Sequence, residues 1–138
     1  MSFGDIYQIA GAGMNAQTIR LNTVASNLAN AGTAAENPES AYRALKPVFA
    51  TIYDATQQGA IGASIEVSDI VQADAPLDMR YEPNHPFANE QGYVAYSNVN
   101  TIEEMADMMA ASRSFETSVE IMNRARSMQQ GLLQLGNK

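Results

Sequence analysis

The side chains in this sequence that could perform chemistry are a group of carboxylates and a single histidine, all between residues 66 and 90. Carboxylates in pairs serve as the acid and base of glycoside hydrolysis, and carboxylates in loops bind Ca²⁺ through their oxygens. This group lacks the spacing of a calcium-binding loop, and nothing in its sequence surroundings favours an acid–base pair. We therefore expect a solvated acidic face, formed by Asp69, Asp74, Asp78, Glu82 and Glu90.

His85 is the only histidine, so a multi-histidine metal site cannot be built. It lies in the segment YEPNHP, where two prolines indicate a turn, and we expect a structural or surface role for it. The chain has no cysteine, no phosphate-binding glycine loop and no nucleophile elbow. The sequence therefore predicts no catalytic, cofactor-binding or metal-ligating residues, and a protein that is not an enzyme.

The formal charge of −7 argues against two classes of partner, nucleic acid and anionic membrane surfaces. The charge is concentrated in the middle of the chain. Residues 34–100 hold nine acidic and three basic residues, whereas residues 1–33 hold one of each. We therefore expect the ends of the chain to pack against other surfaces and the middle to face water. We expect neither nucleic acid nor a small-molecule substrate as a partner.

At 138 residues the chain has the length of about one domain. Residues 1–20 contain no basic start followed by an apolar run, and no segment approaches the roughly 20 apolar residues of a membrane span. We therefore expect neither a cleaved signal peptide nor a membrane helix.

The first element predicted along the chain is a helix within residues 1–33. Its apolar residues recur at steps of four and three, which is the spacing of a helix packed on other helices. The opposite face is polar but uncharged, because no charged residue lies between Arg20 and Glu36. That face contains Asn22, Thr23, Ser26, Asn27 and Asn30. The seam contains Phe3, Tyr7, Ala10, Met14, Gln17, Leu21, Val24, Leu28 and Ala31, with Gln17 as its only polar member.

A second helix of about 35 residues is predicted from Thr101 to Gly136. Thr101 and Glu104 have the spacing of a capping box, and Gly136 is a natural stop. Apolar residues again follow at steps of three and four, and the abundant methionines are typical of an adaptable core stripe. The packing residues predicted here are Met105, Met108, Phe115, Val119 and Met122, followed by a second row of Ile121, Ala125, Met128, Leu132 and Leu135.

Between the two helices the pattern changes to β-branched and aromatic residues that often alternate with polar ones. Residues 46–54, 63–72, 77–82 and 92–99 are predicted strands, and residues 32–40 a loop. We expect an α+β fold with three to five antiparallel strands inserted between two long paired helices. The expected division is a discontinuous helical domain, 1–33 plus 101–138, and a loop and small β-rich region, 34–100.

The segment MNAQTIRLNTVASNLANAGT resembles the N-terminal signature of the flagellar axial proteins, the rod and hook family. The resemblance covers nearly the whole chain, with the segment from YEPNHP to MNRARSM as its second specific part. The Gly-Tyr pair that usually follows the signature is replaced by AAENPESAYRALKPVFA, as in one rod subunit of that family. The motif residues carried over are Arg20, Leu21, Asn22, Ser26, Asn27, Leu28, Ala29, Asn30 and Thr33.

This resemblance implies a subunit of the proximal rod, which assembles helically in the periplasm and transmits torque from the motor to the hook. It implies export through the flagellar type III apparatus without a cleaved signal. The implied partners are further copies of the chain, other rod subunits, the export apparatus and the neighbouring basal-body rings. An uncharged, asparagine-rich face suits a helix buried among other helices, because it can form hydrogen bonds there without burying an unpaired charge.

Two other functions remain open from the residues alone. One is a binding module whose acidic β region recognises a basic protein and whose helices form a dimer. The other is a glycan-cleaving or peptidoglycan-modifying enzyme that uses carboxylates between residues 66 and 90.

Overall fold

The computed structural model describes residues 3–54 and 62–136. Within them, five strands lie between two long helices in the sequence. This confirms the predicted α+β fold with an antiparallel β region between terminal helices. The expectations for residues 1, 2, 137 and 138, and for a turn near Gly59, lie outside the described residues. The elements are α1 (Phe3–Ala29), β1 (Ala34–Ala35), β2 (Leu45–Asp54), β3 (Gly62–Gln72), β4 (Asp78–Tyr81), β5 (Tyr93–Tyr96) and α2 (Thr101–Gly136).

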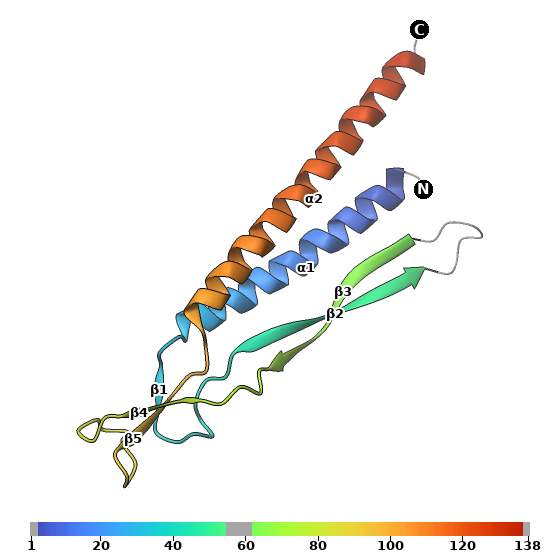
Figure 1. Cartoon of the computed structure of the whole chain (residues 1–138). Helices are drawn as coiled ribbons and strands as arrows, with labels where there is room; N and C mark the ends of the chain where they lie inside the picture. Colours follow the sequence, from blue (N-terminus) through green and yellow to red (C-terminus); the bar gives the residue numbers. More distant parts are fainter. Residues whose placement is uncertain (1–2, 55–61, 137–138) are drawn as a thin grey trace.

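The two helices lie side by side and antiparallel, so that the first and last described residues are at the same end of the molecule (Figure 1). Small residues let the helices approach closely: Ala10, Ala16 and Ala111 are buried. A Cβ atom placed on Gly13 of α1 would lie 3.5 Å from Ser118 Oγ of α2. With 36 residues against 27, α2 extends beyond the start of α1, as Figure 1 shows. Neither of the described helices is apolar over a length that could cross a membrane.

The first turn of α2 differs from the sequence prediction. Asn100 is the N-cap residue, because its Oδ1 accepts a hydrogen bond from the backbone N–H of Ile102 at 3.1 Å. Thr101 is already the first residue of the helix, so the predicted capping box of Thr101 and Glu104 is wrong. The Glu104 side chain instead points into the protein and is buried.

Strands β2 and β3 form a long antiparallel hairpin that packs along α1 (Figure 1). The register shifts once, because Val48 pairs with Asp69 and the next residue, Phe49, pairs with Val67. Ser68 is the extra residue of this bulge, and its hydroxyl donates a hydrogen bond to the carbonyl oxygen of Val48 at 3.2 Å. The predicted strands at 46–54 and 63–72 are confirmed, each longer by one residue at its start.

The other sheet has the strand order β1-β5-β4 and lies at the end of the molecule where α1 ends and α2 begins. Its central strand is the best buried, with Val94 and Ala95 inaccessible to solvent. Residues 32–40 were predicted to be a loop throughout, but Ala34 and Ala35 pair with Tyr96 and Ala95. A strand of two residues is too short to show an alternating pattern in the sequence. It can be recognised only from its pairing with β5.

Gly92 directly precedes β5 and has a conformation that other residues rarely adopt, with φ at +82°. A Cβ atom there would lie 2.8 Å from Tyr81 Cε2 and 3.3 Å from Pro83 Cβ. The Tyr81 ring that a Cβ would meet packs edge-on against Tyr93 with centroids 5.4 Å apart, so it would have to shift this contact to make room.

We expect Gly92→Ala to lower the free energy of unfolding by about 1–3 kcal/mol, the usual cost of a strained backbone conformation. Urea unfolding followed by circular dichroism would measure the loss. Gly131→Ala is the control, since open space surrounds Gly131 in α2 and alanine favours helix there. Equal stability of Gly92→Ala and the unmodified protein would contradict the prediction.

Candidate functional site

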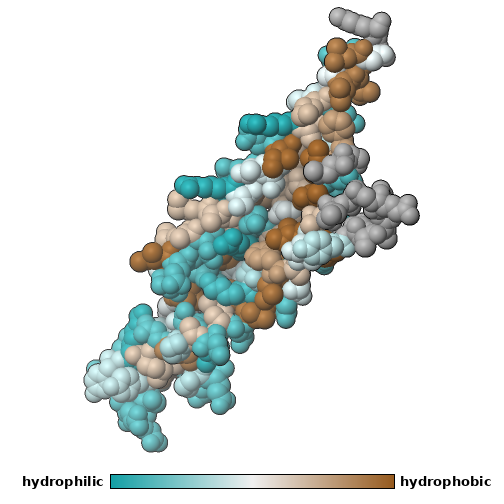
Figure 2. Space-filling view, turned by 45° about the vertical axis from the view of Figure 1, so that its right-hand side comes forward, coloured by the Kyte–Doolittle hydropathy of each residue, from teal (hydrophilic) through white to brown (hydrophobic). Residues whose placement is uncertain are grey.

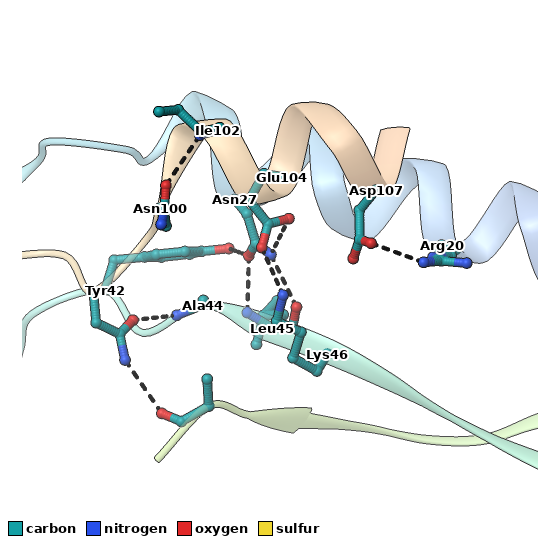
Figure 3. A network of polar contacts seen from close by, with 12 residues as sticks. Arg20, Asn27, Tyr42, Ala44, Leu45, Lys46, Asn100, Ile102, Glu104 and Asp107 are labelled. Atoms are coloured by element: carbon teal, nitrogen blue, oxygen red, sulfur yellow. Dashed lines mark hydrogen bonds and ion pairs between the residues drawn. The ribbon is translucent and has the colours of Figure 1, made fainter. Parts of the chain in front are cut away.

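The described residues with the densest long-range polar contacts lie where the end of α1, the start of β2 and the first turn of α2 meet (Figure 3). We call this group the polar junction. Its hydrogen bonds hold together three elements that are distant in the sequence. Its members are Ser26, Asn27, Tyr42, Leu45, Lys46 and Glu104.

Asn27 is the centre of the polar junction and is completely buried. Its Nδ2 donates to the Leu45 carbonyl oxygen and to Glu104 Oε2, both at 2.9 Å. Its Oδ1 accepts from the Leu45 backbone N–H at 2.8 Å and from the Tyr42 hydroxyl at 3.0 Å. All four hydrogen-bonding positions of the amide are therefore used. The side chain pairs with Leu45 as a neighbouring strand would, which holds β2 against α1.

The Tyr42 hydroxyl continues the network toward the surface. It donates its one hydrogen to Asn27, so the 3.1 Å contact with Ser26 requires the Ser26 hydroxyl to donate to Tyr42. Ser26 and Asn27 are neighbours on the uncharged polar face of α1. That face therefore finds partners within its own chain, from the segment leading into β2.

Glu104 brings a carboxylate into the polar junction with only 2% of its side chain exposed. Its Oε2 accepts from Asn27, and its Oε1 accepts from Lys46 Nζ at 2.9 Å. The lysine side chain is 42% exposed, so the pair joins a buried anion to a half-solvated cation. A buried carboxylate is costly unless it is paired and hydrogen-bonded, and here both oxygens have partners. The pair also fixes α2 in one position relative to β2.

Two further contacts hold the same end of the molecule together. Asn98 Oδ1 accepts from the Ala44 backbone N–H at 2.7 Å, and Asn98 Nδ2 donates to the Ala75 carbonyl oxygen at 2.9 Å. Further along the helix pair, Arg20 of α1 forms an ion pair with Asp107 of α2 at 2.9 Å. Polar contacts thus join α1 and α2 at two positions, Asn27–Glu104 and Arg20–Asp107.

The acidic group predicted to be a solvated face is largely exposed, and its members pair locally. Asp78 forms an ion pair with Arg80 at 2.9 Å. Among residues 3–54 and 62–136, no three histidine, aspartate or glutamate side chains are placed to hold a metal ion. His85 supports the turn between β4 and β5: its Nδ1 accepts from the Phe87 backbone N–H at 3.1 Å, and the two rings lie edge-on.

Glu82 raises the pKa of Tyr96, mainly because the Tyr96 hydroxyl donates a hydrogen bond to Glu82 Oε2 at 3.0 Å. The bond stabilises the neutral phenol, and partial desolvation and the glutamate charge add to the effect. Because the folded-state pKa exceeds the usual value of 10.0, the stabilisation is fully present below pH 10.0 and is lost as pH rises through the folded-state value.

In the folded protein we expect Tyr96 to form its phenolate above pH 10.0. The contribution of Tyr96 is the part of the phenolate absorbance that is missing in Tyr96→Phe. Ultraviolet titration of both proteins gives this difference directly. In Glu82→Gln the same component should develop at lower pH, because the neutral amide no longer repels the phenolate. A Tyr96 component that titrates at or below pH 10.0 in the unmodified protein would contradict the prediction.

The structure places the predicted packing residues of α1 at or near its contact with the other elements. Val24 is buried, and Met14, Leu21 and Leu28 are half-buried. Their role in assembly stays a prediction, because a single chain does not contain the neighbouring subunits.

On α2 the buried line runs through Glu104, Ala111 and Ala125, with Ser118 half-buried between them at the same seven-residue spacing. The predicted stripe is displaced from this line. The predicted stripe begins at Met105, one position after the buried Glu104. Of the predicted packing residues, Met108, Phe115 and Met122 are half-buried, and Met105, Val119, Met128 and Leu132 are exposed in the single chain.

The family-motif residues divide into contact-forming and exposed positions. Arg20 forms the ion pair with Asp107, and Asn27 centres the polar junction. Asn30 Nδ2 donates to the Ser26 carbonyl oxygen, and Thr33 Oγ1 donates to the Asn30 carbonyl oxygen, so these two close the end of α1. Of the other motif residues, Ser26 contacts Tyr42, Leu21 and Leu28 are half-buried, and Asn22 and Ala29 are exposed.

Sequence reasoning missed Tyr42, Lys46 and Glu104 as members of the polar junction, and Asn98 as the link between Ala44 and Ala75. One signal was present for Glu104: it is the only charged residue in the series at 104, 111, 118 and 125. A charged residue in an otherwise small, uncharged seam indicates a buried pair.

Two family models of flagellar basal-body rod proteins match the two ends of the chain. Residues 8–34 match the model described as flagella basal body rod protein, and residues 90–135 match that of the flagellar basal body rod FlgEFG protein C-terminal region. The first range contains Asn27 and the second contains Glu104.

Relatives match over nearly the full length of the chain. The flagellar basal-body rod proteins FlgC of Escherichia coli O6:H1 and of Salmonella typhimurium are each 39% identical over 136 residues, covering 99% of both chains. The FlgC protein of Borreliella burgdorferi is 33% identical over 135 residues, covering 87% of this chain and 88% of its own. The chain belongs to the FlgC family of flagellar basal-body rod proteins.

Proposed function

We propose that this protein is a structural subunit of the rod of the bacterial flagellar basal body. The observation that carries the proposal is the 39% identity to proteins named flagellar basal-body rod protein FlgC over 99% of both chains. Identity that extends over helices, strands and termini alike supports the same role in assembly.

The contacts of the chain suit a subunit that carries a mechanical load. The polar junction ties α1, β2 and α2 together through Asn27 and Glu104, and the Arg20–Asp107 pair adds a second tie between the helices. Directional hydrogen bonds fix one arrangement of these elements, whereas apolar contacts alone permit sliding. A subunit fixed in this way transmits a twisting force without changing its internal packing.

The finer features of this role are also proposals. We propose that the subunit lies in the proximal rod, assembles helically in the periplasm, and passes torque from the motor to the hook. Its partners are further copies of the chain, other rod subunits, the neighbouring basal-body rings and the type III export apparatus, which delivers it without a cleaved signal. We propose no catalytic role, and we propose that residues 1–33 and 101–138 form the rod core while residues 34–100 form a loop and a small β-rich region.

Complementation of a strain that lacks its own copy of this protein tests the function. We expect Phe115→Asp, which adds a charge to a half-buried position of α2, to abolish swimming and to leave purified basal bodies without a rod. Asp74→Ala, at an exposed position of the acidic group, should leave swimming unchanged. Circular dichroism of the purified Phe115→Asp protein shows whether it keeps its secondary structure. Normal swimming of cells with Phe115→Asp as their only copy would contradict the proposal.

A further inference from the structure

Two adjacent lines of side chains on α2 could face α1, and the structure buries the less apolar of the two. The buried line has a spacing of seven residues and consists of Glu104, Ala111, Ser118 and Ala125. The adjacent line, one position later in the sequence, consists of Met105, Ser112, Val119 and Arg126. Met105 is 59% exposed and Val119 is 37% exposed, so the larger apolar side chains of α2 lie outside the contact.

Three large side chains of α2 are neighbours of both lines. These half-buried side chains are Met108, Phe115 and Met122. They follow the buried line by four positions and the adjacent line by three, and both spacings place residues on one face of a helix. A rotation of α2 about its axis by one position, about 100°, therefore keeps them at the contact and exchanges Glu104 for Met105. Arg126 can then keep its guanidinium in solvent while its stem lies along the contact.

The surface of α1 that faces α2 is made of small residues, which permits both arrangements. Ala10 and Ala16 are buried, and Gly13 lies against Ser118. In the observed arrangement small residues therefore face small residues. Figure 2 shows apolar surface running from the free end of α2 toward the hairpin, so large apolar side chains remain outside. Large side chains packed against small ones would bury more apolar area, and this term alone favours the rotated arrangement.

The polar junction stabilises the observed arrangement. Glu104 is 2% exposed and accepts hydrogen bonds from Asn27 and Lys46. Both donors come from other elements and meet at position 104, so they stabilise the burial of that side chain alone. Without them a buried carboxylate is strongly destabilising, and a rotation that carries Glu104 into solvent relieves the cost. In coiled coils, a single buried polar residue fixes the alignment of two helices in the same way.

We propose that α2 has two packing arrangements on α1 and that the polar junction selects between them. With the junction intact, α2 turns Glu104 toward α1 and Met105 toward the surface. With both donors to Glu104 removed, α2 rotates by one position, exposes Glu104, and covers Met105 and Val119. The junction thus decides which side chains of α2 face outward. This choice is made within one chain, so its tests use the isolated protein and do not depend on the rod function.

The reactivity of a single thiol tests the rotation, because the chain has no cysteine of its own. Met105→Cys places that thiol at an exposed position of the full-length protein. Asn27→Leu/Lys46→Met removes both donors to Glu104. In that background we expect the thiol to react with an alkylating reagent roughly tenfold more slowly, because the rotation buries it.

Two controls accompany this measurement. Ala110→Cys lies away from both lines of α2 and is exposed, so its thiol should react at the same rate in both backgrounds. Asn22→Leu changes an exposed asparagine on the same polar face of α1 as Asn27. It should leave the reaction of Met105→Cys unchanged.

Disulfide formation between the helices gives an independent measurement. A Cβ atom on Gly13 lies 3.5 Å from Ser118 Oγ, and a disulfide needs Cβ atoms about 3.5–4.5 Å apart. With the junction intact, Gly13→Cys/Ser118→Cys should therefore cross-link roughly tenfold faster than Gly13→Cys/Val119→Cys. In the Asn27→Leu/Lys46→Met background the order should reverse, because the rotation carries residue 119 to the place of residue 118.

Each other outcome overturns the proposal. An unchanged reaction of Met105→Cys after removal of the donors shows that α2 keeps its arrangement without the junction. A faster reaction shows that the helices separate or unfold and have no second arrangement. A pair with Gly13→Cys that cross-links fastest at Ala125→Cys shows that α2 slides by seven residues, and one that stays fastest at Ser118→Cys shows that α2 does not move.

Discussion

Replacement of Asn27 by leucine is expected to lower the free energy of unfolding by about 3–5 kcal/mol, because several buried polar groups lose their partner at a cost of about 1–3 kcal/mol each. Leucine is similar in size but cannot form hydrogen bonds. The change leaves the Leu45 backbone N–H and carbonyl oxygen without their side-chain partner, and removes one of the two donors to the Glu104 carboxylate. Urea denaturation of the purified protein, with circular dichroism as the signal, measures the difference.

Asn22→Leu is the matched control, since Asn22 belongs to the same polar face of α1 but is exposed. We expect its effect to stay within about 0.5 kcal/mol. The double variant Asn27→Leu/Glu104→Leu should be less destabilised than the sum of its two single variants, because the Asn27–Glu104 hydrogen bond is lost only once and no buried carboxylate remains short of a donor. A loss below about 1 kcal/mol for Asn27→Leu would show that the polar junction does not hold these elements together.

The second large effect is expected at Ala111, where α2 packs most closely. The residue is completely buried, seven positions after Glu104 on the same line of the helix. Aspartate there must either bury a charge or push the helices apart, and we expect a loss of about 4 kcal/mol or more. Hydrogen exchange should show loss of protection in α1 and α2, and cells with this variant as their only copy should not swim.

Ala110→Asp serves as the control, because Ala110 precedes Ala111 and is exposed. We expect a stability change within about 0.5 kcal/mol and normal swimming. Protection in the β strands of Ala111→Asp tests the proposed division of the chain. If residues 34–100 form a separate region, their amides stay protected when the helices open. Normal stability of Ala111→Asp would contradict the close helix pairing.

The elements of this fold could be predicted because their signals are local. The strands at β2, β3, β4 and β5 follow from β-branched and aromatic residues between proline and glycine. The length of α2 follows from sustained apolar spacing that ends at Gly136. β1 was missed because a strand of two residues exists only through its pairing with β5.

The candidate site was predicted only in part. The uncharged asparagine-rich face of α1 marked Asn27, but the sequence did not show what Asn27 would contact. The partners are Leu45, 18 residues away, and Glu104, 77 residues away. In the sequence Glu104 fitted a local capping role, since a glutamate three residues after a threonine satisfies that pattern. Its burial depends on Lys46 and Asn27 arriving from other elements.

The sequence by itself determined that this protein has two long helices with apolar seams, an acidic β region between them, and the motif of a family of flagellar axial proteins. Periodicity, charge and turn residues act over a few positions, so they can be interpreted without a fold. Only the tertiary structure decided which residues of the seams are buried and which polar groups are paired. A one-position change in the phase of α2 exchanges Glu104 for Met105 at the interface, and the free energy that selects between them comes from contacts with α1 and β2.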